Sequence, residues 1–419
     1  MKFGAVDITE RVIRKKFAKT GNIQFAAQPV GLHRGPQNPL MAGFARGLGM
    51  DGHSCVTAAD GAEALDVLVG HAARDDADAA AAGFGQQVEQ RLHVAGLAQG
   101  RDVISLGIGQ PDFRTPEHIV EAAIKALRDG HHGYTAANGI VPLREAVAAD
   151  LHKRFGVDVS PDSVMIMPGG KPTMFMSIVM FGEPGADILY PDPGFPIYRS
   201  MIEFTGAKAI PVPIREENGF AFSAEETLAL ITPKTRLLII NSPANPTGGV
   251  TPKSEIDKLV KGLERFPDVA ILSDEIYAQM TYDGEKHQTL LAYPEIRDRL
   301  VLLDGWSKTY AMTGWRMGYS VWPKPLYDAA RKLAVNSFSC VNASAQYAGL
   351  EALTGPQDAV HAMVQEFDRR RKVVIEGLNK LPNVSAATPK GAFYAFPNIS
   401  KTGWRAKPLA SALLEEAGV

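Results

Sequence analysis

The sequence predicts an α/β protein with a mostly parallel sheet, and three observations lead to this fold class. After residue 100, short apolar or β-branched runs alternate with longer helical patterns, as in consecutive strand–helix–strand units. Each candidate strand is almost continuously apolar, which is typical of strands covered by helices on both faces. Each strand also runs into Gly, Pro, Asp or Ser, and ligands bind beyond the carboxyl ends of such strands.

Five strands and three helices follow from the hydrophobic pattern of this part of the chain. The strands are expected at residues 164–167, 188–190, 237–241, 269–273 and 301–304. Helices are expected at residues 173–181, 326–335 and 356–380.

The bulk properties limit the class of protein and its partners. A chain of 419 residues, 45% apolar and 21% charged, is typical of a globular protein of two or three units. Its net charge of -2 predicts no attraction to nucleic acid or to an anionic membrane. The two cysteines, Cys55 and Cys340, are far apart, which argues against disulfides and thiolate metal sites. Without a secretory signal or a membrane-length apolar run, a cytoplasmic protein is expected.

The first three strand ends carry groups suited to an anion and a flat ring. Gly169, Gly170 and Lys171 precede a predicted helix, and glycine backbone and a helix N-terminus both favour an anion. Phe195, in Pro-Gly-Phe-Pro, has a ring that can stack on a heteroaromatic ring. Asn245, in Asn-Pro-Thr-Gly, has an amide that can donate to a phenolate oxygen. Taken singly, the Gly-Gly-Lys and Asn-Pro-Thr-Gly motifs also fit simple turns, and Phe195 also fits a phenylalanine of the apolar core.

The fourth strand ends in Ser-Asp-Glu-Ile-Tyr, which places Asp274 and Tyr277 three residues apart. Asp274 has two interpretations. It either caps a following helix, or it lies beside a pyridine ring and keeps the ring nitrogen protonated. Tyr277 lies one turn further on if the segment is coiled.

Lys308 follows the fifth strand and precedes an apolar, aromatic segment. A lone loop lysine is ordinarily solvated, whereas burial lowers the pKa of an amine and makes it a usable nucleophile. Arg316 can fork onto phosphate oxygens, and Ser307 adds a hydroxyl. Each signal is weak alone. Together, five strand ends in order offer an anion cradle, a stacking ring, an amide, an acid and a lysine.

Residues 101–419 resemble the class I/II aminotransferases, which are pyridoxal-5′-phosphate (PLP) enzymes of fold type I, and most closely their bacterial aspartate-aminotransferase-like branch. The resemblance rests on motifs that match in identity, order and spacing. These are residues 105–113 (SLGIGQPDF), 133–135 (GYT), 143–145 (LRE), 245–248 (NPTG), 273–277 (SDEIY) and 307–316 (SKTYAMTGWR).

The resemblance implies a role for each residue around the cofactor ring. Lys308 would be the Schiff-base lysine and would carry the proton during amino-group transfer. Asp274 would pair with the pyridinium nitrogen. Asn245 and Tyr277 would donate to the ring hydroxyl, and Phe195 would stack on the ring.

Other matched residues would bind the phosphate and the substrates, an amino acid and a 2-oxo acid. Tyr134 would reach the phosphate of the neighbouring subunit, which implies a homodimer with shared active sites. Gly109 would lie in the loop that approaches the substrate carboxylate. The phosphate cradle would consist of Gly169, Gly170, Lys171, Ser307 and Arg316.

The resemblance also implies a seven-stranded, mostly parallel sheet between helices in a large domain, and a small α/β domain that is incomplete at its C-terminus. The expected boundaries are 86–121 for the N-terminal arm and part of the small domain, 122–354 for the large PLP-binding domain and 355–419 for the small domain. Residues 1–85 are expected to be poorly ordered, because their Ala/Asp/Gly-rich composition does not offset ordering entropy. Residues 52–65 resemble a receiver domain only faintly.

This sequence departs from the family pattern at its C-terminus. The family carries an arginine that clamps the substrate carboxylate in the remainder of the small domain, and this sequence ends at Val419. Arg114 and Arg405 are candidate substitutes, although neither matches the motif position. A PLP-binding protein with little activity therefore stays open as an alternative.

Two other functions stay open at this point. A β-lyase or a synthase would use the same scaffold, because a fold does not fix the reaction type. A transcription regulator with a DNA-binding arm is disfavoured, because residues 1–95 show no helix-turn-helix pattern and no basic cluster beyond 14–16. His131 and His132 lack a third ligand at a recognisable spacing, so no metal site is predicted.

Overall fold

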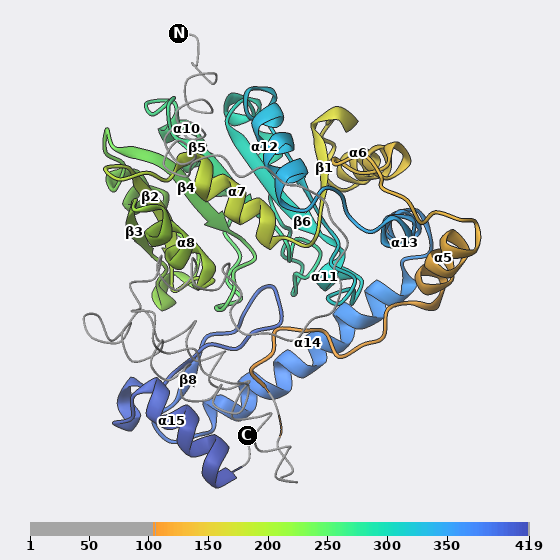
Figure 1. Cartoon of the computed structure of the whole chain (residues 1–419). Coiled ribbons are helices and arrows are strands. Elements are labelled where there is room, and N and C mark those ends of the chain that lie inside the picture. The colour runs from red at the N-terminus through yellow and green to blue at the C-terminus, as the bar shows by residue number, and fades with distance from the viewer. Residues whose placement is uncertain (1–103, 105, 418–419) are drawn as a thin grey trace, which may run out of the picture. The chain divides into compact units, whose positions relative to one another are not determined.

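The computed structural model describes residues 104 and 106–417, all within one compact unit (Figure 1). The predictions for residues 1–85, for residues 86–103 and for Ser105 lie outside the described residues. None of the helices in the described part of the chain is long and apolar enough to span a lipid bilayer.

A single seven-stranded sheet forms the centre of this unit, with strand order β1-β7-β6-β5-β4-β2-β3. All neighbouring pairs are parallel except the two made by β7, which is antiparallel to both β1 and β6. The predicted mostly parallel α/β sheet is therefore confirmed. The strands are β1 (Val164–Met167), β2 (Asp187–Asp192), β3 (Lys208–Pro213), β4 (Thr235–Asn241), β5 (Ala270–Asp274), β6 (Leu300–Gly305) and β7 (Gly318–Val321).

All five strands expected from the sequence are present, and β1 has the predicted bounds. The sequence prediction missed β3 and β7. β3 is a partly exposed edge strand with Pro211 and Pro213, and proline weakens a strand signal. β7 has four residues, begins at Gly318 and contains Ser320, so its apolar run is too short to stand out.

Helices cover both faces of the sheet, and alternate strand residues divide between two apolar cores. In β1, Val164 and Ile166 belong to one core, whereas Met165 and Met167 belong to the other. The first core includes side chains from α5 (Glu117–Arg128), α6 (Val141–Phe155), α10 (Lys253–Leu263) and α13 (Ala343–Thr354). The second includes side chains from α7 (Lys171–Phe181), α8 (Ile197–Thr205) and α12 (Lys324–Ser337). The short helix α9 (Ala224–Ala229) packs against α10.

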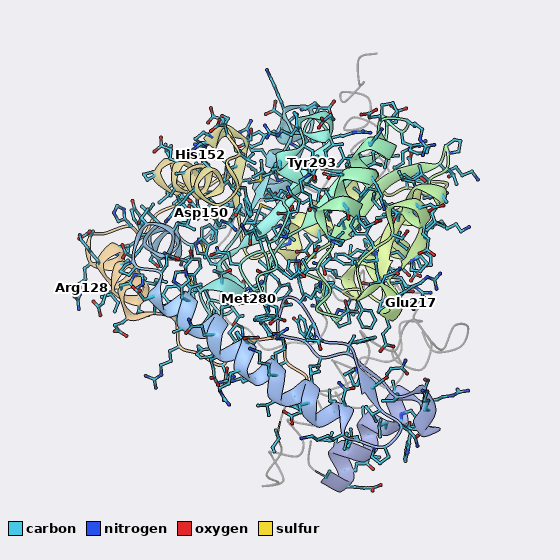
Figure 2. The ribbon with its side chains drawn as sticks, turned by 180° about the vertical axis from the view of Figure 1, so that it is seen from behind. Arg128, Asp150, His152, Glu217, Met280 and Tyr293 are labelled. Atoms are coloured by element: carbon cyan, nitrogen blue, oxygen red, sulfur yellow. The ribbon has the colours of Figure 1, made fainter. Side chains whose placement is uncertain are left out.

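The chain after α13 continues into the long helix α14 (Asp358–Asn379), which Figure 1 shows below the sheet. A third apolar core joins this helix to the segment after β5, and Met280, labelled in Figure 2, contributes to it with Met363 and Phe367 of α14. Arg371 of α14 reinforces the contact through paired hydrogen bonds to Asp283. The remaining elements are α14 (Asp358–Asn379), β8 (Ser385–Ala386), β9 (Pro397–Asn398), α15 (Ala406–Ala412) and the π-helix Leu413–Ala417.

Candidate active site

The five predicted strand ends meet at one edge of the sheet. Strands β2, β4, β5 and β6 are parallel, and β1 shares their direction because both β1 and β6 are antiparallel to β7. At this edge Asp274 is in register with Asn241 on one side and with Leu303 on the other. The motifs that follow these strands are therefore brought together, as the sequence predicted.

Asp274, the last residue of β5, is a buried carboxyl group with 2% exposure. Its Oδ2 accepts a hydrogen bond of 2.6 Å from the Tyr198 hydroxyl, and its Oδ1 accepts one from the Ile276 amide. Burial raises the pKa of Asp274 to about 6. None of the ion pairs in the described part of the chain includes Asp274. The residues that follow form a turn, so Asp274 does not cap a helix.

Tyr198 is a site residue that the sequence prediction missed. It lies in the first turn of α8, three residues after Phe195, and its side chain is fully buried. No local spacing indicated this role, because the Tyr198 hydroxyl meets Asp274 across 76 positions of the chain. Burial and the Asp274 carboxylate raise the pKa of the Tyr198 hydroxyl well above its usual range, so it remains a donor.

Tyr277 and Tyr394 form a pair of hydrogen-bonded phenols at this edge. Tyr277 is 2% exposed, and burial raises its pKa well above the usual range. The Tyr394 hydroxyl also lies against the backbone of Gly109, where an added Cβ would stand 2.6 Å from it. Tyr394, which the sequence prediction did not single out, therefore connects the turn after β5 to the loop at Gly109.

Lys308 lies in the four-residue helix α11 (Trp306–Thr309), directly after β6. Its Nζ donates to the Gly109 carbonyl and lies 5.8 Å from the centre of the Phe393 ring. Burial lowers the pKa of Lys308 to about 8, and the positive charges of Arg316 and Lys171 act in the same direction. At a pH near 8 about half of the Lys308 amine is unprotonated, and the unprotonated form can act as a nucleophile.

Three glycines bring backbones together where the anion cradle is predicted. Gly169 has φ +84°, and the Arg316 guanidinium lies against its Cα, where a side chain would clash. A Cβ on Gly318 would stand 2.7 Å from the carbonyl carbon of Gly169, and a Cβ on Gly305 would stand 2.6 Å from the Cα of Gly318. This close approach of the backbones is possible only because the side chains are absent.

The other residues that are predicted to bind the phosphate lie on the neighbouring segments. Gly170 precedes α7, which begins at Lys171, so the free N–H groups of the first turn are at this edge. Lys171 and Arg316 are exposed, whereas Ser307 is buried in α11. The Arg316 Nη1 donates to the Thr313 carbonyl at 2.7 Å.

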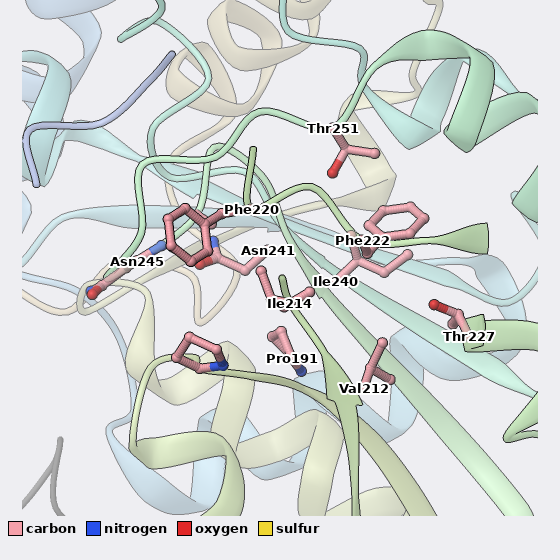
Figure 3. A pocket seen from close by; sticks show the side chains of 12 residues that line it. Pro191, Val212, Ile214, Phe220, Phe222, Thr227, Ile240, Asn241, Asn245 and Thr251 are labelled. Carbon is pink, nitrogen blue, oxygen red and sulfur yellow. The ribbon is translucent and has the colours of Figure 1, made fainter. Parts of the chain in front are cut away.

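Phe195 and Asn245 lie at the ends of β2 and β4 as predicted. The Phe195 ring is 5.7 Å from the Lys171 Nζ and meets the Tyr198 ring edge-on. Asn241 fixes the loop that carries Asn245. Its side-chain Oδ1 accepts from the backbone N–H of Asn245 at 2.8 Å, and its Nδ2 donates to the backbone carbonyl of Asp274. Figure 3 shows both asparagines beside a small pocket that is otherwise mainly apolar and includes Phe220. This pocket adjoins the site, and neither Asp274 nor Lys308 lines it.

Three predicted residues lie away from the buried groups. Tyr134 is 91% exposed on the surface. Arg114 is exposed and lines a groove with Tyr310 and Met363. Arg405 is exposed at the start of α15.

The arrangement fits PLP. A buried carboxylate without a cationic partner suits a protonated ring nitrogen, and a partly buried amine with a lowered pKa suits an aldehyde. The glycine contact, flanked by exposed Lys171 and Arg316, suits a phosphate group. The fold and the site together define a PLP-dependent transferase of fold type I.

Comparison with known proteins identifies the family. The family model for aminotransferase class I and II matches residues 101–419, and the chain belongs to this family. It is 37% identical to an aspartate aminotransferase of Geobacillus stearothermophilus over 77% of this chain and 83% of that protein. It is 39% identical to aromatic-amino-acid aminotransferase 2 of Thermococcus litoralis over 77% of this chain and 84% of that protein.

A solved structure gives the same result. The aspartate aminotransferase of Rhizobium meliloti superposes with a TM-score of 0.76 at 32% identity, covering 80% of this chain and 86% of that one. The protein is therefore a PLP-dependent transaminase that acts on amino acids and 2-oxo acids.

Replacing Tyr198 with phenylalanine is expected to make activity more sensitive to acid. The change removes a donor from the Asp274 carboxylate, so the pKa of Asp274 rises and the ionised form is lost at higher pH. The acid limb of the pH profile of kcat/KM should move to higher pH, with a loss of about tenfold near pH 6. Tyr293→Phe, which removes a hydroxyl that donates to Asp257, is the matched control. An acid limb that coincides with that of the control would contradict this account of Tyr198.

Proposed function

We propose that Lys308 and Asp274 carry the chemistry by which this transaminase moves an amino group between an L-amino acid and a 2-oxo acid. The observation that supports the proposal is that a buried carboxyl group and a partly buried amine lie at the same edge of the sheet. The pKa of Asp274 is raised to about 6 and that of Lys308 is lowered to about 8. Environments that shift the pKa values of two groups in opposite ways assign them different roles at one site, here a counter-ion and a base.

PLP supplies, when bound, a cationic conjugated ring that accepts the electron pair released from the substrate Cα. Asp274 Oδ1 and Oδ2 would hold the ring nitrogen in its protonated form, and Tyr198 would hold that carboxylate in place. Lys308 Nζ would bind the cofactor, take the proton from the substrate Cα and return it to the cofactor side. Tyr277 and Asn245 would donate to the ring hydroxyl.

The phosphate would be held where the three backbones meet. Gly170 would offer an N–H group beside the Gly169 backbone, Ser307 would offer a hydroxyl, and Lys171 and Arg316 would offer positive charge. Phe195 would cover one face of the ring. Gly109, whose carbonyl accepts from Lys308 Nζ, would lie beside the substrate carboxylate.

The amino donors proposed are aspartate and related amino acids. Relatives that are 36–39% identical are named for aspartate, for aromatic amino acids and for asparagine. The test is to mix the purified, PLP-loaded full chain with single amino acids and to record the absorbance spectrum of the cofactor. Aspartate should change the spectrum, and a 2-oxo acid should restore it. Release of many equivalents of 2-oxo acid per cofactor in the absence of an amino acceptor would instead indicate a lyase.

The active unit proposed is a homodimer with shared sites. Tyr134, matched to the residue that reaches the neighbouring phosphate, is 91% exposed, and Leu106 in the segment before Gly109 is 79% exposed. Such apolar exposure is typical of a surface that a second copy covers.

Mixing two inactive variants is expected to restore activity if the sites are shared. A heterodimer of a Lys308→Ala subunit and a Tyr134→Ala subunit has one site with both residues intact. Random pairing of equal amounts should therefore recover about a quarter of the wild-type activity. Assay after joint refolding checks this, and each variant refolded alone is the control. Recovery no greater than the sum of the separate variants would exclude shared sites.

A further inference from the structure

A buried carboxylate–histidine pair, Glu275 and His287, lies at the end of β5 next to Asp274 and has no role in the reaction described above. Glu275 follows Asp274, and its side chain is 2% exposed. The Glu275 Oε2 accepts from His287 Nε2 at 2.6 Å. The Oε1 of the same carboxylate accepts from the Ser273 hydroxyl, the Thr289 hydroxyl and the Leu290 amide, at 2.9, 3.3 and 3.1 Å.

The histidine of this pair is also buried. The His287 side chain is 3% exposed, and its ring meets the Phe155 ring edge-on with centres 5.8 Å apart. Its Nδ1 has no hydrogen-bond partner in the described part of the chain. Burying an acid, an imidazole and an unpaired nitrogen is costly. A purely stabilising contact would be better made with apolar side chains, so the pair calls for another explanation.

The position of Glu275 suggests what the pair does. Successive residues of a strand point to opposite faces of the sheet. Asp274 contacts Tyr198 of α8, whereas Glu275 contacts His287, whose ring in turn meets Phe155 of α6. The Glu275 amide donates to the Leu303 carbonyl of β6 at 2.8 Å. The end of β5 is therefore held from both faces and from the neighbouring strand.

We propose that Glu275 and His287 are positioning residues that hold the end of β5, and the turn to Tyr277, in the orientation that the PLP ring requires. This inference rests on the proposed function. Rotation of the backbone at residue 275 would tilt Asp274 and shift Tyr277, and it would break the four hydrogen bonds of the Glu275 carboxylate. Sites of this kind need geometry held to within about 0.5 Å by supporting side chains.

The test compares His287→Ala with His118→Ala in the full chain. His118 is the matched control, because its Nδ1 contacts Glu351 at 3.0 Å between α5 and α13. Two quantities are measured on each cofactor-free protein: the dissociation constant for PLP and the unfolding temperature. For His287→Ala the dissociation constant should rise by about tenfold. For His118→Ala it should not change, although both variants lower the unfolding temperature.

Two milder variants separate positioning from loss of folding. His287→Gln keeps a donor for Glu275 and should bring the dissociation constant for PLP back to within about threefold of the wild type. Ser273→Ala removes another donor from the same carboxylate without a large cavity, and should weaken PLP binding by about threefold. If His287→Ala does not fold, the dissociation constant of Ser273→Ala for PLP alone tests the positioning role. In the folded His287→Ala enzyme, kcat should fall more than KM rises, because the ring is held at the wrong angle.

The outcomes distinguish this inference from the proposed function. If borohydride fixes PLP on Lys308 in the wild type, yet the folded His287→Ala and Ser273→Ala variants bind PLP as tightly as His118→Ala, the positioning role is wrong and the proposed function stands. If the wild type itself forms no reducible adduct at Lys308, both are wrong.

Discussion

Lys308→Ala is expected to abolish transamination, with kcat reduced by about 10⁴-fold, because one amine both binds the cofactor and moves the proton. The lowered pKa of this lysine, about 8, comes mainly from burial, so another lysine in solvent does not replace it. Borohydride treatment followed by peptide mass spectrometry should find the cofactor on residue 308 in the wild type. In the variant no lysine should carry it.

The control for this result is Lys253→Ala, which removes an exposed lysine that pairs with Asp257 on α10. Its activity should equal that of the wild type. The Lys308→Ala protein itself should fold at least as well as the wild type, since a desolvated amine has been removed. Substantial turnover by Lys308→Ala, or cofactor fixed elsewhere, would rule out the role assigned to this residue.

Asp274→Asn is expected to have the second largest effect, a fall in kcat of about 10³-fold. An amide of the same shape cannot stabilise a positive ring nitrogen, and loss of one partner of a buried charge pair costs about 3–5 kcal/mol. The dissociation constant for PLP should rise as well. Both are measured on the full chain above pH 7, where the wild-type carboxyl group is ionised.

The same variant should change the pH dependence of stability in a defined direction. The pKa of Asp274 in the folded protein, about 6, lies above its ordinary value of 3.8, so the folded state binds the proton more tightly than the unfolded state. In the cofactor-free wild type this group therefore lowers stability as the pH rises from about 4 to about 6. Asp274→Asn should remove that decline. Asp187→Asn, which alters a buried strand aspartate that accepts from Thr232, is the control and should keep it.

Most of the sheet could be predicted because the strands in question are buried on both faces and consequently apolar throughout. Strand β1, with four fully buried residues, appeared with the predicted bounds. The two missed strands carry other signals: β3 contains two prolines at the sheet edge, and β7 begins with glycine and has four residues. A search for continuous apolar runs does not detect strands that are interrupted by proline, glycine or serine.

Apart from Gly109 and Tyr134, the predicted site residues follow strands in order, and strand direction alone brings them to one edge. Tyr198, Tyr394 and His287 were missed because they reach the site by packing between distant segments. Tyr394 meets Tyr277 across 117 positions, and no local pattern encodes such a contact. Glu275 was read only as part of a motif, because three of its four hydrogen-bond partners lie 12 to 15 residues further on.

The contact among Gly169, Gly305 and Gly318 has a consequence for anyone who wishes to retune this enzyme. The inverted strand β7 is inserted directly behind the loop at Gly169, with no space for even a methyl group. An alanine at any of the three would push on its neighbours and displace the loop, although Gly305 and Gly318 are not expected to touch a ligand. Mutant libraries that aim at a different amino donor should therefore keep these three glycines and vary only residues whose side chains face the substrate.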